Sequence, residues 1–272
     1  MTAIAVSIAG SDSCAGAGIQ ADLKTFSALG VYGVTIITAI TAQNTRGVQA
    51  VHIVPAPMIK KQLQSIFLDF KVDAIKIGML PDEGSILSVA GFLSDIGINN
   101  IVLDPVMISS SGHNLASHQA LNSLKTRLLP LASLLTPNLS EAARLLDVEV
   151  AQNRLQIETQ AKALKDLGPG SVLMKGGHSG EEGSADFLLT DTGGEWIEGV
   201  RHPTINTHGT GCTLSSAITA FLASGHSMEK AVRLAKSWTA QTIFHADEIK
   251  AGSGTGPVHQ FFKEWNSGFE TI

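Results

Sequence analysis

The chain has 272 residues, of which 44% are hydrophobic and 16% are charged, and its formal net charge is −5. This size and apolar content are enough for a large buried core, and the mildly acidic balance excludes a general affinity for nucleic acid or for an anionic membrane surface. The two cysteines, Cys14 and Cys212, predict no disulfide framework and no zinc site, because no histidine or further cysteine lies at ligand spacing.

The sequence also predicts a cytoplasmic protein without a membrane partner. The first residues, MTAIAVSIAG, have neither the basic start nor the long apolar region that is typical of a signal peptide. The most apolar stretch, GVTIITAITA, is too short to cross a membrane, which takes roughly 20 apolar residues. The low cysteine content suits a reducing compartment.

Short β-rich runs alternate with longer helical patterns along much of the chain. The predicted strands are Ile4–Ala9, Val34–Thr41, Ala74–Ile77, Ile101–Leu103, Leu134–Thr136 and Ser171–Met174. The predicted helices between them lie near Gly18–Leu29, Pro57–Phe70, Asp82–Ile96, Ser117–Leu128, Leu139–Leu146 and Asn153–Leu167. Almost continuously apolar strands separated by helices are typical of an α/β protein whose parallel sheet is covered on both faces.

From residue 185 onward the predicted elements no longer alternate between strand and helix. Ala185–Thr190 and Glu195–Val200 are expected to form a hairpin across the turn DTGG, followed by helices at Cys212–Leu222 and Met228–Phe244. The glycine-rich stretch 252–257 predicts a turn before a short final helix. No repeat or linker interrupts the pattern, so we expect residues 1–272 to form a single domain.

Polar, glycine-rich stretches follow the carboxyl ends of the predicted strands. They are AGSDSCAGAG, TAQNT, KIGML, LDPVM, TPNLSE and MKGGH. In an open parallel sheet, ligands bind outside this edge. The sequence therefore predicts one ligand site that is built from all of these stretches.

The motif HGTGC adds a glycine turn at the start of a predicted helix. Gly209 and Gly211 permit a tight turn, and the free amides of the helix start, together with the helix dipole, attract an anion such as phosphate. A glycine loop that only turns the chain is the alternative interpretation. Cys212 lies in this turn, where a carboxylate would be the ordinary choice for a proton acceptor.

Three of the stretches carry groups that suit a nucleotide. Asn138 and Glu141 have the spacing of a helix cap, yet their oxygens also suit Mg²⁺ held through water, and both interpretations can hold together. Lys175 follows a buried strand and suits a phosphate, although no P-loop motif is present. Asp104 either braces its loop or lies near the metal and phosphates. His178 could be a further contact, but a lone histidine in a loop is more often incidental.

Other stretches suit a small heteroaromatic ligand. The amide of Gln43 can donate and accept, which fits a ring with an amino group beside a ring nitrogen, although Gln43 could equally anchor its loop. Gly10 and Asp22 flank the first glycine-rich loop. Met79 and Val106 are either apolar walls of the pocket or part of the core.

These motifs, in this order, resemble the vitamin-kinase branch of the ribokinase-like superfamily, and the resemblance covers nearly the whole chain. They are most similar to the hydroxymethylpyrimidine/phosphomethylpyrimidine kinases of thiamine biosynthesis. The stretches that carry the resemblance are IQADLKTFSALGVYG, ITAQNTRGVQ, KIGML, LDPVMISSSG, TPNLSEA, MKGGH and HGTGC. Cys14 and Ala15 depart from that family, which more often has Ser and Gly there.

The resemblance implies a three-layer α/β/α sandwich with a mostly parallel sheet, ATP with Mg²⁺, and a homodimer. It implies two phosphorylations, first of a hydroxymethyl group and then of the resulting monophosphate. The implied pyrimidine contacts are Gln43 and Asp22, with Gly10, Ala17, Met79 and Val106 around the ring. The implied catalytic residues are Gly209, Thr210, Gly211, Cys212 and Lys175. The implied nucleotide-binding residues are Asn138, Glu141, Lys175 and Asp104, of which Asn138 and Glu141 meet the metal through water.

A cysteine at position 212 has a physical rationale if the acceptor is first an alcohol and then a phosphate. A thiol at a helix start is expected to have a lowered pKa, so that it could accept a proton near neutrality. A fixed carboxylate would repel the anionic second substrate, whereas a neutral thiol would not. Cys212 is therefore expected to act as a base or as part of the anion hole.

Two alternatives remain from the sequence. Some members of the same branch are pyridoxal kinases with a similarly placed cysteine, and these often have a second cysteine in the lid that follows DPVM. The corresponding stretch here, ISSSGHNLAS, has no cysteine and favours the pyrimidine. A non-catalytic pyrimidine sensor is the other alternative, and the presence of Asn138, Glu141, Lys175 and Cys212 argues against it.

Overall fold

The computed structural model describes residues 2–107, 118–176 and 184–265. In this part of the chain a nine-stranded sheet has the order β3-β2-β1-β4-β5-β6-β7-β8-β9. The strands from β2 to β7 in this order are parallel: β2 (Tyr32–Asn44), β1 (Ile4–Asp12), β4 (Ala74–Ile77), β5 (Ile101–Leu103), β6 (Leu134–Leu135) and β7 (Val172–Met174). Antiparallel strands complete both sides: β3 (Gly47–Ile53), β8 (Asp186–Thr190) and β9 (Gly193–Ile197).

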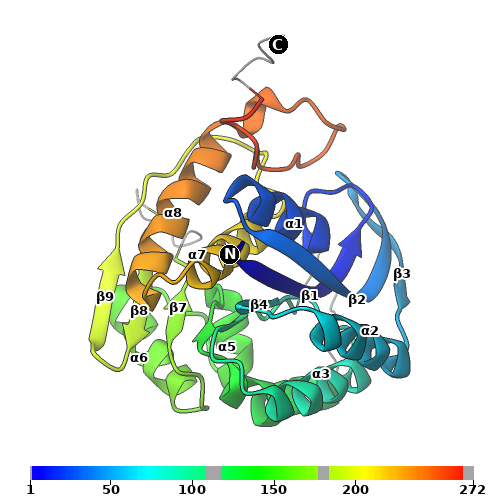
Figure 1. Ribbon diagram of the computed structural model, residues 1–272. Helices are drawn as coiled ribbons and strands as arrows, with labels where there is room; N and C mark the ends of the chain where they lie inside the picture. The colour runs from blue at the N-terminus through cyan, green and yellow to red at the C-terminus, as the bar shows by residue number, and fades with distance from the viewer. Residues whose placement is uncertain (1, 108–117, 177–183, 266–272) are drawn as a thin grey trace.

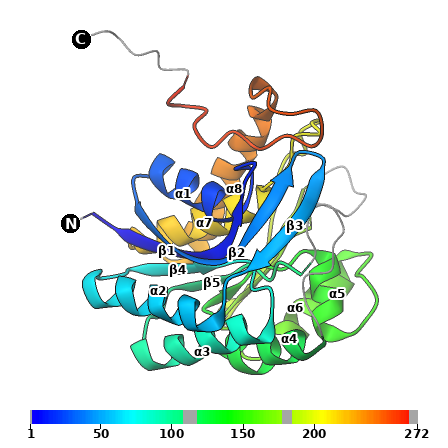
Figure 2. The same cartoon turned by 90° about the vertical axis from the view of Figure 1, so that its right-hand side faces the viewer.

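Helices cover both faces of the sheet, as Figures 1 and 2 show. One face carries α1 (Gly18–Ala28), α7 (Thr210–Ala223) and α8 (Met228–Phe244). The opposite face carries α2 (Ala56–Asp69), α3 (Glu83–Ile96), α4 (His118–Ser123), α5 (Leu139–Leu146) and α6 (Arg154–Lys165). This arrangement confirms the expected ribokinase-like α/β/α sandwich with a mostly parallel sheet.

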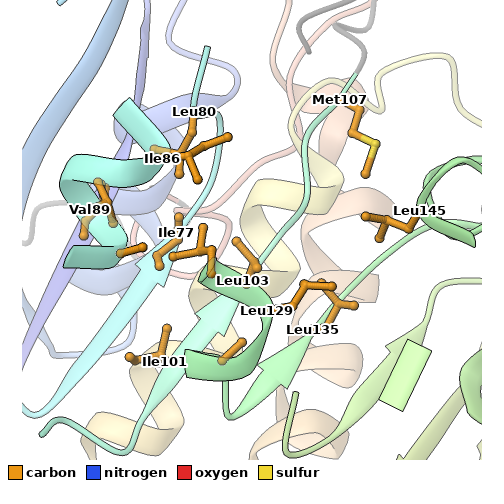
Figure 3. Packing of buried hydrophobic residues seen from close by; sticks show 14 of the residues in the cluster. Ile77, Leu80, Ile86, Val89, Ile101, Leu103, Met107, Leu129, Leu135 and Leu145 are labelled. Atoms are coloured by element: carbon orange, nitrogen blue, oxygen red, sulfur yellow. The ribbon is translucent and has the colours of Figure 1, made fainter. Parts of the chain in front are cut away.

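The main core lies between the sheet and the layer of α2, α3, α5 and α6, and part of it is drawn in Figure 3. Ile75 and Ile77 of β4 belong to this core, whereas Ala74 of the same strand belongs to the core beneath α7 and α8. Because side chains alternate across a strand, Lys76 faces the same side as Ala74. The sequence AIKI therefore places a lysine under α7, inside a strand that is otherwise apolar.

Several predicted elements keep their bounds, and others differ for identifiable reasons. Ala74–Ile77, Ile101–Leu103, Leu139–Leu146 and Met228–Phe244 are correct to the residue. The predicted helix Ser117–Leu128 is α-helical at His118–Ser123 and changes to a π turn at Leu124–Leu128, followed by a 3₁₀ turn that contains Pro130. The stretch TAQNT belongs largely to β2, because pairing with the unpredicted strand β3 extends β2 to Asn44.

The predicted short final helix is wrong for the described residues, which form turns after residue 257. The glycine-rich stretch before it pairs with two distant loops. The amide of Gly254 donates to Thr45 Oγ1 over 3.1 Å, and the amide of His208 donates to the Gly256 carbonyl over 3.0 Å. A Cβ at Gly254 would lie 2.0 Å from the Thr45 carbonyl oxygen, so this close approach requires glycine. The segment therefore joins the tip of β2 to the loop before α7.

Ala15 generates a prediction about stability, because it is one of two described non-glycine residues with a positive φ, 62°. A residue with a Cβ atom costs about 1–2 kcal/mol in this left-handed backbone conformation. A glycine avoids this cost, and the extra backbone entropy that it loses on folding costs less, about 0.4–1 kcal/mol. We expect Ala15→Gly to raise the free energy of unfolding by about 0.5–1 kcal/mol in urea denaturation. The matched control Ala163→Gly, within α6, should lower it by a similar amount. A destabilising Ala15→Gly would contradict this account of the loop.

Candidate active site

The start of α7 forms a turn that lies against the loop before α1. Its N-cap residue, Gly209, has a φ of 82°. A Cβ at Gly209 would lie 1.8 Å from the carbonyl oxygen of Gly16, so only glycine allows the two loops to meet. Thr210 and Gly211 follow as the first residues of the helix. The Thr210 amide donates to the Thr207 carbonyl and the Thr213 amide to the Gly209 carbonyl. The amides of Gly211 and Cys212, which lie between these two, have the arrangement expected of an anion site.

Cys212 lies in the same turn and meets the start of a second helix. The backbone amide of Gly18, the first residue of α1, donates a hydrogen bond to the cysteine sulfur. Although the residue keeps some exposed surface, burial of the thiol raises the pKa of Cys212 to about 11, and the positive charge of Lys76 opposes this only in part. The thiol is therefore neutral at pH 7. The expected lowering of its pKa is wrong, because desolvation outweighs the helix start and the nearby cation.

Lys175, which follows β7, forms an ion pair with Asp104, which follows β5. The distance from Lys175 Nζ to Asp104 Oδ1 is 2.8 Å, and Asp104 also accepts hydrogen bonds from Thr136 and from Ser215 of α7. Burial disfavours the charge, yet the ion pair with Lys175 holds the pKa of Asp104 below its usual value. A Cβ at Gly211 would lie 3.4 Å from Lys175 Nζ. The structure therefore brings Lys175 and Asp104 to the start of α7.

Asn138 and Glu141 form the predicted cap at the start of α5. The Glu141 amide donates to Asn138 Oδ1 and the Asn138 amide donates to Glu141 Oε2, both over 2.8 Å. Glu141 Oε2 also lies 3.8 Å from Lys175 Nζ. Burial raises the pKa of Glu141 to about 7, because Lys175 supplies too little positive charge to offset it. A divalent cation would supply the missing charge, and the oxygen donors suit Mg²⁺, so these residues fit the implied metal.

Of the residues expected around the small molecule, Ala17 lies beside the α7 turn, and Gly10 and Met79 lie beside each other. A Cβ at Gly10 would lie 2.4 Å from Met79 Cε, so the two residues are in contact. Ala17 approaches the turn, because a Cβ at Gly209 would lie 3.3 Å from the Ala17 Cα atom. Val106 is half-buried in the segment after β5. These positions are compatible with a ring site beside the anion turn, and the ring contacts themselves remain predictions.

Gln43, near the end of β2, lies beside His208 of the loop before α7. Its Nε2 atom lies 3.3 Å from His208 Nε2, and its Oε1 atom lies 3.3 Å from Thr41 Oγ1. His208 Nε2 is also 2.8 Å from Asp12 Oδ2. A His208 Nε2–H that donates to Asp12 cannot also accept from the Gln43 amide. The loop is therefore anchored by the Gln43 backbone, which exchanges hydrogen bonds with Ser13 Oγ over 2.8 and 2.7 Å, and the ring contact of the side chain stays a prediction.

Asp12 organises the first glycine-rich loop. Its carboxylate accepts hydrogen bonds from the backbone amides of Cys14, Gly16 and Ala17. Burial would raise the pKa of Asp12, but the hydrogen bond from His208 and those from the loop amides hold it below the usual value. The ligand atoms of Asp12, Cys14 and His208 lie within 4.8 Å of one another. Because both carboxylate oxygens are bonded to loop amides, this group holds the loop rather than a metal.

The position of Asp22 does not fit the ring contact that the sequence predicted for it. Its side chain has no exposed surface and forms an ion pair with Lys76, with an Nζ to Oδ2 distance of 2.8 Å. Ser7 of β1 and Ser216 of α7 donate hydrogen bonds to the same carboxylate over 2.5 and 2.6 Å. Its oxygens are therefore occupied inside the protein, behind the turn that carries Cys212.

Three residues that matter to this arrangement were not singled out from the sequence: Lys76, Asp12 and His208. A signal existed for Lys76, because a lysine between two isoleucines in a short buried strand needs a buried partner. No comparable signal identifies the partner of His208, since Asp12 lies 196 positions away in sequence. Two further expectations, His178 and the lid stretch ISSSGHNLAS, lie outside the described residues.

Comparison with known proteins identifies the family of the chain. The sequence profile described as phosphomethylpyrimidine kinase matches residues 12–259. The chain belongs to this family. Hydroxymethylpyrimidine/phosphomethylpyrimidine kinase of Escherichia coli is 48% identical over 261 residues, covering 96% of this chain and 98% of the relative. The Rhizobium meliloti protein of the same description is 49% identical over 266 residues, covering 97% and 99%.

Solved structures of family members and of a neighbouring activity have the same fold. Phosphomethylpyrimidine kinase of Clostridium difficile is 42% identical, with a TM-score of 0.79 over 89% of this chain and 100% of that chain. Pyridoxal kinase of Bacillus subtilis is 34% identical, with a TM-score of 0.88 over 96% of this chain and 98% of that chain. The fold is therefore shared by enzymes that are named for two different acceptors.

The raised thiol pKa predicts slow alkylation of Cys212. In a Cys14→Ser background Cys212 is the chain's remaining cysteine, and its reaction with iodoacetamide should be about 10²-fold slower at pH 7 than that of a free thiol of pKa about 8.5. The rate should rise tenfold per pH unit up to pH 9.5 without a plateau, since the thiolate fraction limits it. The same protein unfolded in urea is the control. A plateau below pH 8.5 would contradict a neutral thiol.

Proposed function

We propose that this chain is an ATP-dependent kinase of thiamine biosynthesis that phosphorylates 4-amino-5-hydroxymethyl-2-methylpyrimidine and then its monophosphate. The observation that carries the proposal is the likeness to kinases named for both steps, at 48% identity across 96% of the chain. The site adds physical support, because a helix-start anion turn, a lysine–carboxylate pair and a capped carboxylate lie together at the carboxyl edge of the sheet. A non-catalytic sensor would not need this group of charges.

The proposed mechanism uses position and charge more than a strong base. Bound ATP supplies the phosphoryl group, whose loose transition state is stabilised mainly by fixed donors and cations. The amides at Gly211 and Cys212 would receive the negative charge that develops, and Lys175 would hold phosphate oxygens beside them. Gln43 would read the amino edge of the pyrimidine, while Gly10, Ala17, Met79 and Val106 would enclose the ring. The neutral Cys212 thiol would not repel the anionic second acceptor.

Mg²⁺ is part of this proposal and would be held through water by Asn138 and Glu141. Its chemistry would be to neutralise negative charge on the phosphates. The supporting observation is the raised pKa of Glu141, a carboxyl that lies 3.8 Å from one cation and is still short of positive charge. Glu141 would then have two roles: it would cap α5 and accept hydrogen bonds from the waters bound to Mg²⁺.

A homodimer is also proposed, as the family resemblance implies. The antiparallel edge strand β3 supports it, because Val51 and Ile53 are 41% and 40% exposed and Ile40 of β2 is 51% exposed. An apolar edge strand is a surface that proteins usually cover. No described helix of the chain is long and apolar enough to cross a membrane, and the cytoplasm is our proposed location.

Pyridoxal kinase is the second candidate, favoured by the TM-score of 0.88 to the Bacillus subtilis enzyme. Release of ADP with the hydroxymethylpyrimidine, its monophosphate or pyridoxal as acceptor separates the two. We expect both pyrimidines to give a kcat/KM at least about tenfold above that for pyridoxal, because Gln43 matches an aminopyrimidine edge. EDTA should abolish turnover and excess Mg²⁺ should restore it. Preference for pyridoxal would overturn the proposed acceptor, and no turnover with any acceptor would favour a sensor.

A further inference from the structure

Lys76 and Asp22 form a second buried ion pair next to the candidate active site. Neither side chain has exposed surface, and Lys76 Nζ lies 2.9 and 2.8 Å from the two carboxylate oxygens of Asp22. A buried ion pair is weak evidence for a stabilising role, because desolvation offsets much of the attraction. The position of the pair in the fold is therefore better evidence of its role than its contribution to stability.

The Asp22 carboxylate connects four elements at one point. Asp22 belongs to α1 and Lys76 to β4, while Ser7 of β1 and Ser216 of α7 donate hydrogen bonds over 2.5 and 2.6 Å. The two helices joined here are the ones whose starts meet at Cys212, through the Gly18 amide. The pair therefore fixes α1 and α7 relative to each other and to the central sheet.

The two buried ion pairs are attached to neighbouring residues of α7. Ser216 donates to Asp22. The Ser215 hydroxyl lies 3.3 Å from Asp104, the partner of Lys175, and 3.0 Å from the Gly211 carbonyl, and these two acceptors compete for its one proton. The first turn of α7 is thus held from two sides by carboxylates that are each neutralised by a lysine. A displacement of about 1 Å at a phosphoryl-transfer site costs on the order of 10² in rate, so a fixed α7 start is a functional requirement.

We propose that Lys76 and Asp22 are positioning residues for phosphoryl transfer, which hold the starts of α1 and α7 together around Cys212. The inference rests on the proposed role of the α7 turn, and it assigns no ring contact to either residue. Lys76 also places a positive charge near the thiol. Asp22 and Asp104 also act on the thiol, and their negative charges raise its pKa. The charge of Cys212 in turn raises the pKa of Lys175.

Kinetics of three variants test the proposal. Ser216→Ala removes only the α7 link, Lys76→Met removes the cation, and Lys76→Met/Asp22→Asn removes both charges while it keeps a hydrogen-bonding group. We expect kcat to fall about tenfold in Ser216→Ala and about 10²-fold in Lys76→Met, equally for both phosphorylations, with the acceptor KM within about twofold of wild type. The double variant should fold and lose at least about tenfold in kcat. Ser224→Ala, at the far end of α7, is the matched control and should keep wild-type kcat.

Alkylation of Cys212 gives a second readout that needs no substrate. In the Cys14→Ser background, Lys76→Met should slow the reaction with iodoacetamide at pH 9 about tenfold, because a cation that favours the thiolate is lost, while Ser224→Ala should leave it unchanged. Wild-type kcat and wild-type alkylation in a folded Lys76→Met or double variant would overturn the proposal. A wild-type chain that fails to phosphorylate the pyrimidine would instead overturn the proposed acceptor, and an unchanged alkylation rate in Lys76→Met would then still count against an action of the pair at Cys212.

Discussion

Neutralisation of buried charge around the start of α7 is the constraint on which this site depends. The Lys76–Asp22 pair has no exposed surface, whereas in the Lys175–Asp104 pair the lysine keeps 14% of its side chain exposed. Ser216 of α7 donates to Asp22, and Ser215 of α7 lies beside Asp104. Removing one partner would leave an isolated buried charge, which costs several kcal/mol. The pairs therefore restrict the helix to one position, and the glycines at 209 and 211 let backbone amides approach a ligand there.

The same arrangement explains how a cysteine can serve two acceptors. Cys212 is enclosed by these charges and by the Gly18 amide, yet burial keeps its thiol neutral. A neutral thiol neither repels a phosphate nor removes a proton efficiently from an alcohol. In the proposed mechanism the chemistry would depend on the amides of the turn and on the lysines, which would act alike on both reactions. The sequence left Cys212 open as a base or as part of the anion hole, and the raised pKa of its thiol favours the second role, which we propose.

Local patterns made much of the fold predictable, and contacts distant in sequence made the rest unpredictable. Apolar runs such as Ala74–Ile77 fixed the central strands, because a strand buried on both faces needs no long-range information to be recognised. β3 was missed since its residues are largely exposed, and its strand conformation depends on pairing with β2. The polar stretches indicated the correct edge of the sheet. They could not show that Asp22 turns inward to Lys76, because these residues lie 54 positions apart and nothing between them gives a signal of their contact.

The central claim is that Cys212 contributes a fixed, neutral position in the anion turn and not a base. The rates of the first and second phosphorylation by Cys212→Ala, each measured with its own acceptor, test this most directly. The account predicts that both rates fall by the same factor, because the Gly211 and Cys212 amides serve both transition states. A loss of about 10²–10⁴-fold that is confined to the alcohol acceptor would be the signature of a general base and would contradict the account.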